Sequence, residues 1–395
     1  MFNYLLLAGI ALGLGLLIGK GTYWLKITGV IGYILTGIIL GPDVLNVIHL
    51  SPLESETIAD FALGIVAFII GGELTLKLLK PMGKSIIAII IGESLGAFFL
   101  VLFGVYFLTG NLVESIIFAS LAPASAPAGT VAVIHEYRAK GKLTDAILAV
   151  VGFDDGLAIL IYAFAMAFVM LLLSGGAFSI TTVVFAPLIE IIAAIVLGLG
   201  VGGVFAFLLK RVVEREEIIA LSITAICITA GIALFFELSL ILSCMVLGMI
   251  IINIYPQDNK PVFTTMKTIT LPIYILFFVV AGLNMDLKLL AGIGLLGIVY
   301  IICRSLGLIS GSYFSAVLSK ADAVIRNNIG LGILSQAGVA IGLSLIAAHK
   351  LASIGQEELG TLIVTTIAAT TVVFEIIGPI GARIAISRAK EIGKA

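Results

Sequence analysis

The sequence has little charge for its length. Only 11% of its 395 residues are charged, against roughly 25% in an ordinary soluble domain, and 61% are hydrophobic. A soluble fold of this size would need far more polar surface, so a soluble globular protein is excluded. The net charge of −1 gives no sign of a nucleic-acid partner, and none is expected.

Cysteine and histidine are also scarce, with three of each. The cysteines all lie in apolar runs without the spacing of metal ligands, and the histidines belong to different loops. No nucleotide-binding loop is recognisable. A zinc site, a cofactor and an enzymatic activity are therefore not expected. Because no Pro/Ser-rich linker or polar tail occurs, residues 1–395 are predicted to form a single membrane domain without a soluble regulatory domain.

What the sequence has in abundance is long apolar runs. A helix needs about 17–25 predominantly apolar residues to cross a bilayer. On this criterion the chain is predicted to be an all-α polytopic membrane protein with thirteen spans. The predicted spans cover residues 4–19, 25–42, 57–79, 84–109, 113–135, 143–173, 181–209, 217–234, 236–255, 266–287, 291–318, 325–348 and 357–382.

The basic residues test this topology independently. The loops after odd-numbered spans with the span ends beside them, together with the C-terminus, carry nineteen of the 22 lysines and arginines, and the loops after even-numbered spans carry two. The remaining one, Arg304, lies inside a span. Because basic loops stay in the cytoplasm, we expect a cytoplasmic C-terminus and an N-terminus outside.

Two segments resemble each other at an offset of 211 residues. Residues 71–79 (GGELTLKLL) match 282–290 (GLNMDLKLL), and residues 91–96 (IGESLG) match 302–307 (ICRSLG). The offset equals seven spans, an odd number, so the two copies must have opposite orientations in the membrane. We predict two inverted six-helix repeats, approximately 1–180 and 211–390, joined by a linker helix at 181–210.

Spans 5 and 12 are equivalent under this repeat, and both contain helix-breaking sequence. Pro123 and Pro127 each remove a helical donor in span 5, and span 12 contains the polar, flexible stretch 335–339. Non-helical backbone is tolerated at this depth only where it lines protein or a wet cavity. We therefore expect two crossed broken helices, with a substrate site beside them.

Ionisable side chains inside the spans are the candidate functional residues, because each costs several kcal/mol unless it is paired or hydrated. Glu375 is expected to anchor the core by hydrogen bonding. Glu190 stands alone in the linker helix, where a role at an interface or snorkelling toward the membrane surface is expected rather than ion binding. The candidates are Glu93, Asp154, Asp155, Glu190, Arg304 and Glu375.

The adjacent pair Asp154 and Asp155 is the most informative of these. Neighbouring residues are about 100° apart on a helix, so one carboxylate can face the broken helices while the other faces an adjacent span. Carboxylate oxygens suit hard cations such as Na⁺, and desolvation with mutual repulsion favours protonation. A site that holds either a cation or protons meets the requirement for exchange.

Arg304 is expected to need an acidic partner, because it is a guanidinium inside a span. Glu93, its equivalent in the repeat, and Asp154 are both candidates. Repeat symmetry favours Glu93, and the sequence does not decide between them. A channel and exchange of K⁺ for H⁺ also stay open as alternatives to Na⁺/H⁺ exchange.

In combination these features resemble the cation:proton antiporter-2 family, and within it the NapA-like sodium/proton antiporters. The resemblance rests on the pair in Gly152–Gly156, the prolines of span 5, the segment Phe278–Asp286, the basic residue at 304 and Glu375–Pro379. It implies the NhaA-like antiporter fold, alternating access and a homodimer in the lipid bilayer of the plasma membrane. Na⁺ (or Li⁺) and H⁺ would be its substrates.

By the same resemblance, Asp155 would be the principal carrier of cation and proton, and Asp154 its accessory. Ser125 and Thr130 would line the broken helix. Two aspartates imply electrogenic exchange. Arg304 stands where a lysine is usual, and arginine does not lose its proton when buried. Electroneutral exchange is therefore an alternative.

Overall fold

The computed structural model describes most of the chain. The described residues are 4–24, 29–48, 52–72, 83–126, 130–131, 133–134, 137–173, 185–212, 214–254, 262–283 and 294–393. They form α-helices, with no strand among them. Parts of the repeat match, residues 73–79 and 284–290, lie outside the described residues.

Fourteen α-helices are described, and they confirm the prediction of an all-α polytopic fold. They follow the thirteen predicted spans in order, and span 12 is divided between two helices, α15 and α16. The helices are α1 Tyr4–Trp24, α2 Gly29–Leu40, α3 Pro52–Gly71, α5 Gly83–Thr109, α6 Leu112–Leu121, α8 Lys142–Leu173, α9 Ala186–Leu209, α10 Arg215–Phe235, α11 Leu240–Ile254, α12 Val262–Leu283, α14 Gly294–Leu318, α15 Ala323–Gly332, α16 Gly338–Ala352 and α17 Glu357–Arg388.

Eight of these helices are long and apolar enough to cross a membrane unaided. The shorter apolar helices include α6 and α16, which are segments of the two interrupted spans. Large apolar side chains such as Phe107, Phe314 and Leu318 stand exposed on the outside of the molecule. Such exposure suits contact with lipid and would be a liability in water.

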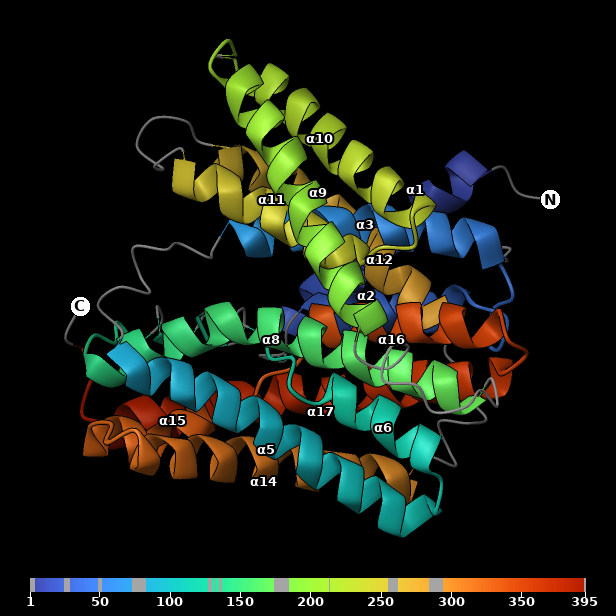
Figure 1. The fold of residues 1–395 in the computed structure, drawn as a ribbon. Helices are drawn as coiled ribbons and strands as arrows, with labels where there is room; N and C mark the ends of the chain where they lie inside the picture. The colour runs from blue at the N-terminus through green and yellow to red at the C-terminus, as the bar shows by residue number, and fades with distance from the viewer. Residues whose placement is uncertain are drawn as a thin grey trace.

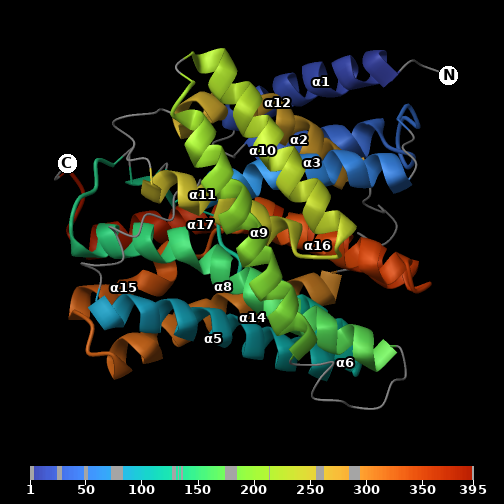
Figure 2. The same ribbon diagram turned by 45° about the horizontal axis from the view of Figure 1, so that its top comes forward.

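The helices divide into two bundles (Figure 1). One, which we call the site bundle, contains α5, α6, α8, α14, α15, α16 and α17. The other, which we call the flanking bundle, contains α1, α2, α3, α9, α10, α11 and α12. Figure 2 shows the same separation after rotation. The main contacts between the bundles are those of α8 with α9 and α11, of α3 with α16 and of α12 with α17.

Within the site bundle, α5 and α14 cross at very short range. A Cβ atom added at Gly96 would lie 2.5 Å from the carbonyl oxygen of Gly307, so only glycine fits there. Each helix carries a small-xxx-small motif at the crossing, Gly92 with Gly96 and Gly307 with Gly311, which lets the two backbones approach. This crossing brings α5, which carries Glu93, against the helix that carries Arg304.

The two ends of the chain lie on opposite sides of the molecule, as an odd number of crossings requires (Figure 1). Near the C-terminus, Glu391 is buried against the start of α8. Its carboxylate accepts hydrogen bonds from the backbone N–H groups of Leu143 (2.9 Å) and Thr144 (2.8 Å) and from the Thr144 hydroxyl (2.7 Å). Glu391 therefore satisfies donors at the N-terminus of the helix that carries the aspartate pair.

Candidate functional site

Two interrupted helices cross inside the site bundle. Helix α6 ends at Leu121, the backbone is non-helical over residues 122–126, and helical conformation is found again at residue 130. The second interruption separates the end of α15 at Gly332 from the start of α16 at Gly338. The Ala126 N–H donates to the Ser335 carbonyl oxygen across the crossing (3.0 Å). The predicted pair of crossed broken helices is confirmed.

The interruptions leave backbone carbonyls without their helical partners in an apolar interior, where each needs another donor. Side chains supply two of these donors. The Gln336 amide donates to the Leu121 carbonyl oxygen (3.1 Å), and the Thr130 hydroxyl donates to that of Gly332 (3.0 Å). Thr130, which we expected to line the broken helix, thus connects the two interruptions.

Arg304 donates to four more carbonyls of the two interruptions. Its Nε donates to the carbonyl of Ala122 (2.9 Å), and Nη1 donates to that of Leu334 (2.8 Å). Its Nη2 donates to the carbonyls of Ala124 (2.9 Å) and Ser335 (3.3 Å). The positive charge therefore lies where the negative ends of the α6 and α15 dipoles converge.

The guanidinium is fully buried and also lies 4.3 Å from the centroid of the Phe374 ring, at cation–π distance. The expectation of a direct acidic partner is wrong. Among the described residues, no carboxylate lies within ion-pair distance of Arg304. Glu93 and Asp154 interact with it electrostatically at longer range. The physical reason is that a planar five-donor group matches several converging carbonyls better than one carboxylate could.

Asp154 faces the crossing. It is fully buried, and one carboxylate oxygen accepts a hydrogen bond from the Ser125 hydroxyl in the first interruption. Its other oxygen, Oδ1, accepts no hydrogen bond from any residue that the structure describes. Asp154 and Ser125 thus present oxygen atoms to one point beside the non-helical backbone.

Asp155 is equally buried, with 1% of its surface exposed. It lies about 100° around α8 from Asp154, on the face that it shares with Tyr162, seven residues further on. Tyr162 lines a cavity between the two bundles. The pair therefore has one carboxylate toward the crossing and the other on the helix face that leads to this cavity.

Glu93 and Glu375 differ in their relation to the crossing. The Ser94 hydroxyl donates to Glu93 Oε1 (2.6 Å), Glu93 is fully buried, and it interacts electrostatically with Asp154 and Arg304. Glu375 is buried on α17, one turn before Gly378, which packs directly against Ser335 in the second interruption. Its role as an anchor stays a prediction.

Sequence reasoning missed Tyr300 and the role of Gln336. The Gln336 amide donates to the Tyr300 hydroxyl (2.9 Å) as well as to the backbone of α6. The Tyr300 ring packs between those of Phe118 and Phe374. Tyr300 precedes Arg304 by one helical turn, and that spacing was the available signal.

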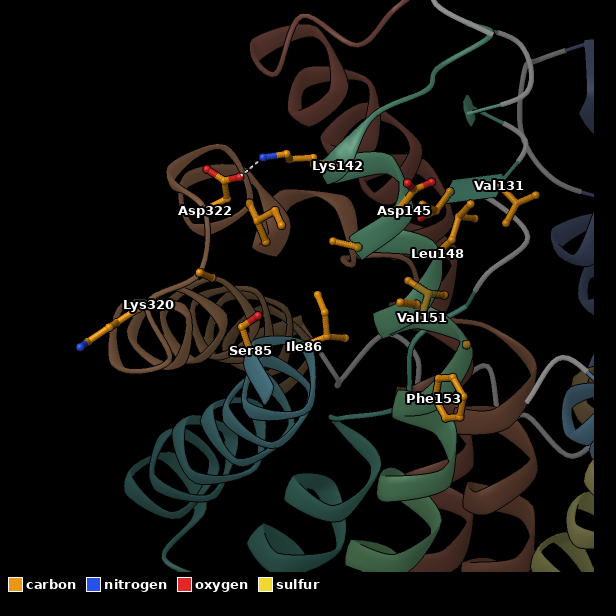
Figure 3. A pocket seen from close by; sticks show the side chains of 16 residues that line it. Ser85, Ile86, Val131, Lys142, Asp145, Leu148, Val151, Phe153, Lys320 and Asp322 are labelled. Carbon is orange, nitrogen blue, oxygen red and sulfur yellow. Dashed lines mark hydrogen bonds and ion pairs between the residues drawn. The ribbon is translucent and has the colours of Figure 1, made fainter. Parts of the chain in front are cut away.

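Cavities approach α8 on either side of the aspartates. One of about 800 Å³ is lined by the first half of α8 up to Phe153 and by Thr130 (Figure 3). At its mouth Lys142 forms an ion pair with Asp322 (2.6 Å), and the hydrogen bond from Lys142 lowers the pKa of the Asp322 carboxyl. The other cavity, of about 590 Å³, lies further along α8 toward its C-terminal end and is lined by Tyr162.

A family model and two solved structures, all of sodium/proton exchangers, match this chain. The family model described as "Sodium/hydrogen exchanger, transmembrane" matches residues 8–380. Two structures of the sodium proton antiporter MjNhaP1 from Methanocaldococcus jannaschii have a similar fold. One, at pH 8, has a TM-score of 0.74 at 19% identity, and the other, an electron-microscopy map, has 0.74 at 18%. Each match covers 98% of both chains. No curated protein matches the sequence.

Proposed function

The chain belongs to the sodium/hydrogen exchanger family, and from this premise we propose that it exchanges Na⁺ or Li⁺ for H⁺ by alternating access. The observation that carries the proposal is the fully buried carboxylate of Asp154 beside Asp155 at the crossing of two interrupted helices. Buried carboxylates bind either a hard cation or protons, and competition between the two couples their movements.

In this proposal Asp155 is the principal carrier and Asp154 the accessory one, with hydroxyl oxygens from Ser125 and Thr130. Ser125 already donates to Asp154, and its oxygen lone pairs suit a dehydrated Na⁺. Thr130 holds the second interruption in place through Gly332 and lines the larger cavity. Arg304 keeps its proton, because arginine does not deprotonate in proteins, and so it carries none across.

The arrangement of the helices supports movement of one bundle against the other. The site bundle contains both interrupted helices and both aspartates, and its contacts with the flanking bundle are few compared with those inside each bundle. The site bundle would carry the cation, and the flanking bundle would stay fixed in a homodimer in the plasma membrane. The N-terminus would face outward, as the distribution of basic residues predicts.

The test is transport by the purified protein in liposomes. A pH gradient should be dissipated by Na⁺ and Li⁺, and K⁺ should have little effect. A response to K⁺ alone would favour K⁺/H⁺ exchange, and cation flux that persists without any proton movement would indicate a channel. Charge movement on a supported membrane then separates electrogenic from electroneutral exchange. With two carboxylates in the site we expect net charge movement.

A further inference from the structure

The cavity beyond the aspartates collects charged side chains from both bundles. It has a volume of about 590 Å³ and lies between α3, α8, α9, α10, α11 and α16. Its charged or titratable lining residues are Asp60, Glu190, Glu237, His349 and Lys350. Glu237, His349 and Lys350 lie at the ends of even-numbered spans, which the basic-residue distribution places outside.

Tyr162 is the unusual member of this lining. It is 5% exposed, and its hydroxyl has no hydrogen-bond partner among the described residues. A buried hydroxyl without a partner is uncommon in folded proteins and calls for an explanation such as an ion that completes its contacts. Glu190 on α9 is close enough to Tyr162 to interact with it electrostatically.

The chemistry of this pair suits an alkali cation. A neutral hydroxyl oxygen and a carboxylate are hard oxygen ligands, and both belong to half-buried or buried residues. Lys350 also interacts with Glu190, so an ammonium group is available to balance the carboxylate when no cation is present. Glu237 adds a second negative charge near Glu190.

The position of the pair relates it to the central site. Tyr162 follows Asp155 by seven residues, which is two helical turns, or about 10 Å along the axis on the same face of α8. A cation that enters this cavity from outside therefore meets Tyr162 and Glu190 before it reaches Asp155.

We propose that Tyr162 and Glu190 form a second, outer binding site for a monovalent alkali cation, at which Na⁺ or Li⁺ resides before it passes to Asp155. The site is distinct from the aspartate pair and bridges the two bundles. The proposal deepens the proposed function and rests on it. Lys350 competes with the cation for Glu190.

Binding of radioactive Na⁺ to the purified protein tests the proposal without reliance on transport. In Asp155→Asn the central site is weakened, and we expect a residual saturable Na⁺ component. Adding Glu190→Gln should abolish that component, and adding Tyr162→Phe should weaken it about threefold, equivalent to the loss of one modest oxygen contact. Lys350→Gln should strengthen it. Glu216→Gln, an exposed carboxylate change on α10, is the matched control and should leave it unchanged.

The outcomes separate this site from the proposed function. If Asp155→Asn binds no Na⁺ although wild type exchanges Na⁺ for H⁺, the outer site does not exist and the exchange function stands. The same conclusion follows if Glu190→Gln leaves the residual binding intact in a protein with unchanged thermal stability. If wild type fails to exchange any cation but residual binding responds to Glu190→Gln, the exchange function fails and the binding site stands.

Discussion

Replacement of Arg304 tests the view that this residue holds the two interrupted helices together. Four hydrogen bonds run from its guanidinium to the carbonyls of Ala122, Ala124, Leu334 and Ser335. The Ser335 carbonyl keeps a second donor, the N–H of Ala126. Arg304→Ala would therefore leave three buried carbonyls without a donor.

The expected loss in the free energy of unfolding follows from the cost of leaving buried carbonyls without hydrogen-bond donors. Each buried acceptor left unsatisfied costs about 1–3 kcal/mol, so Arg304→Ala is expected to cost about 3–9 kcal/mol before any loss of the cation–π contact. That is comparable with the whole stability of a typical domain, about 5–15 kcal/mol. Arg304→Ala is thus expected not to fold. Arg304→Lys keeps the charge but cannot reach all the carbonyls from one nitrogen, and we expect a loss of about 2–4 kcal/mol.

The assay is thermal unfolding in detergent, read by loss of monodisperse protein on size exclusion, with Glu93→Gln as the contrasting variant. The amide of Glu93→Gln can still accept the hydrogen bond from Ser94, so its Tm should fall much less than that of Arg304→Lys. Equal losses in the two variants would mean that an ion pair with Glu93, and not the set of carbonyls, accounts for the role of Arg304. An unchanged Tm in Arg304→Lys would show that the hydrogen bonds from the guanidinium to these carbonyls do not stabilise the fold.

Three further predictions concern other contacts. Ser125→Ala removes the hydroxyl that donates to Asp154. The apparent KM for Na⁺ in liposomes should then rise about two- to tenfold, which corresponds to the free energy of one hydrogen bond. An unchanged KM would mean that the cation binds away from Ser125. Glu391→Ala removes the acceptor for the first N–H groups of α8. The free energy of unfolding should fall by about 1–2 kcal/mol, measured as a lower Tm. A Tm equal to that of wild type would show that water replaces the carboxylate fully. The hydrogen bond from Lys142 lowers the pKa of Asp322 in the folded protein. The ion pair therefore stabilises the fold fully above the ordinary carboxyl pKa of about 4. Its contribution is lost only as the pH falls through the lowered pKa of Asp322 in the folded state. Lys142→Ala should accordingly leave the pH profile of exchange unchanged above about pH 5, and a shift of that profile would contradict this.

The sequence predicted those features that depend on local composition. Apolar runs located the helices, and Pro123 with Pro127 located the first interruption because proline removes a backbone donor wherever it stands. The second interruption required the internal repeat as well, since residues 335–339 contain no proline. Helical geometry predicted that one carboxylate of the pair faces the broken helices, but not that this carboxylate is Asp154.

Contacts between helices that are distant in the sequence could not be predicted in this way. The partners of Arg304 are backbone carbonyls, and their availability arises only when the ends of α6 and α15 converge. Glu190 was expected at an interface, but its proximity to Tyr162 depends on how the two bundles face each other. Glu391 lies in a charged segment near the C-terminus, and its contact with the start of α8 arises only when distant parts of the chain pack together.

In the proposed function the aspartate pair carries the exchanged ions, and a transport measurement on variants of α8 tests this role. Dissipation of a pH gradient by Na⁺ should be compared in liposomes for wild type, Asp155→Asn and Asp145→Asn. Asp145 is an exposed carboxylate on the same helix, so its variant controls for loss of charge on α8. We expect Asp155→Asn to abolish the exchange and Asp145→Asn to retain it. Full exchange by correctly folded Asp155→Asn would show that Asp155 does not carry the exchanged ions.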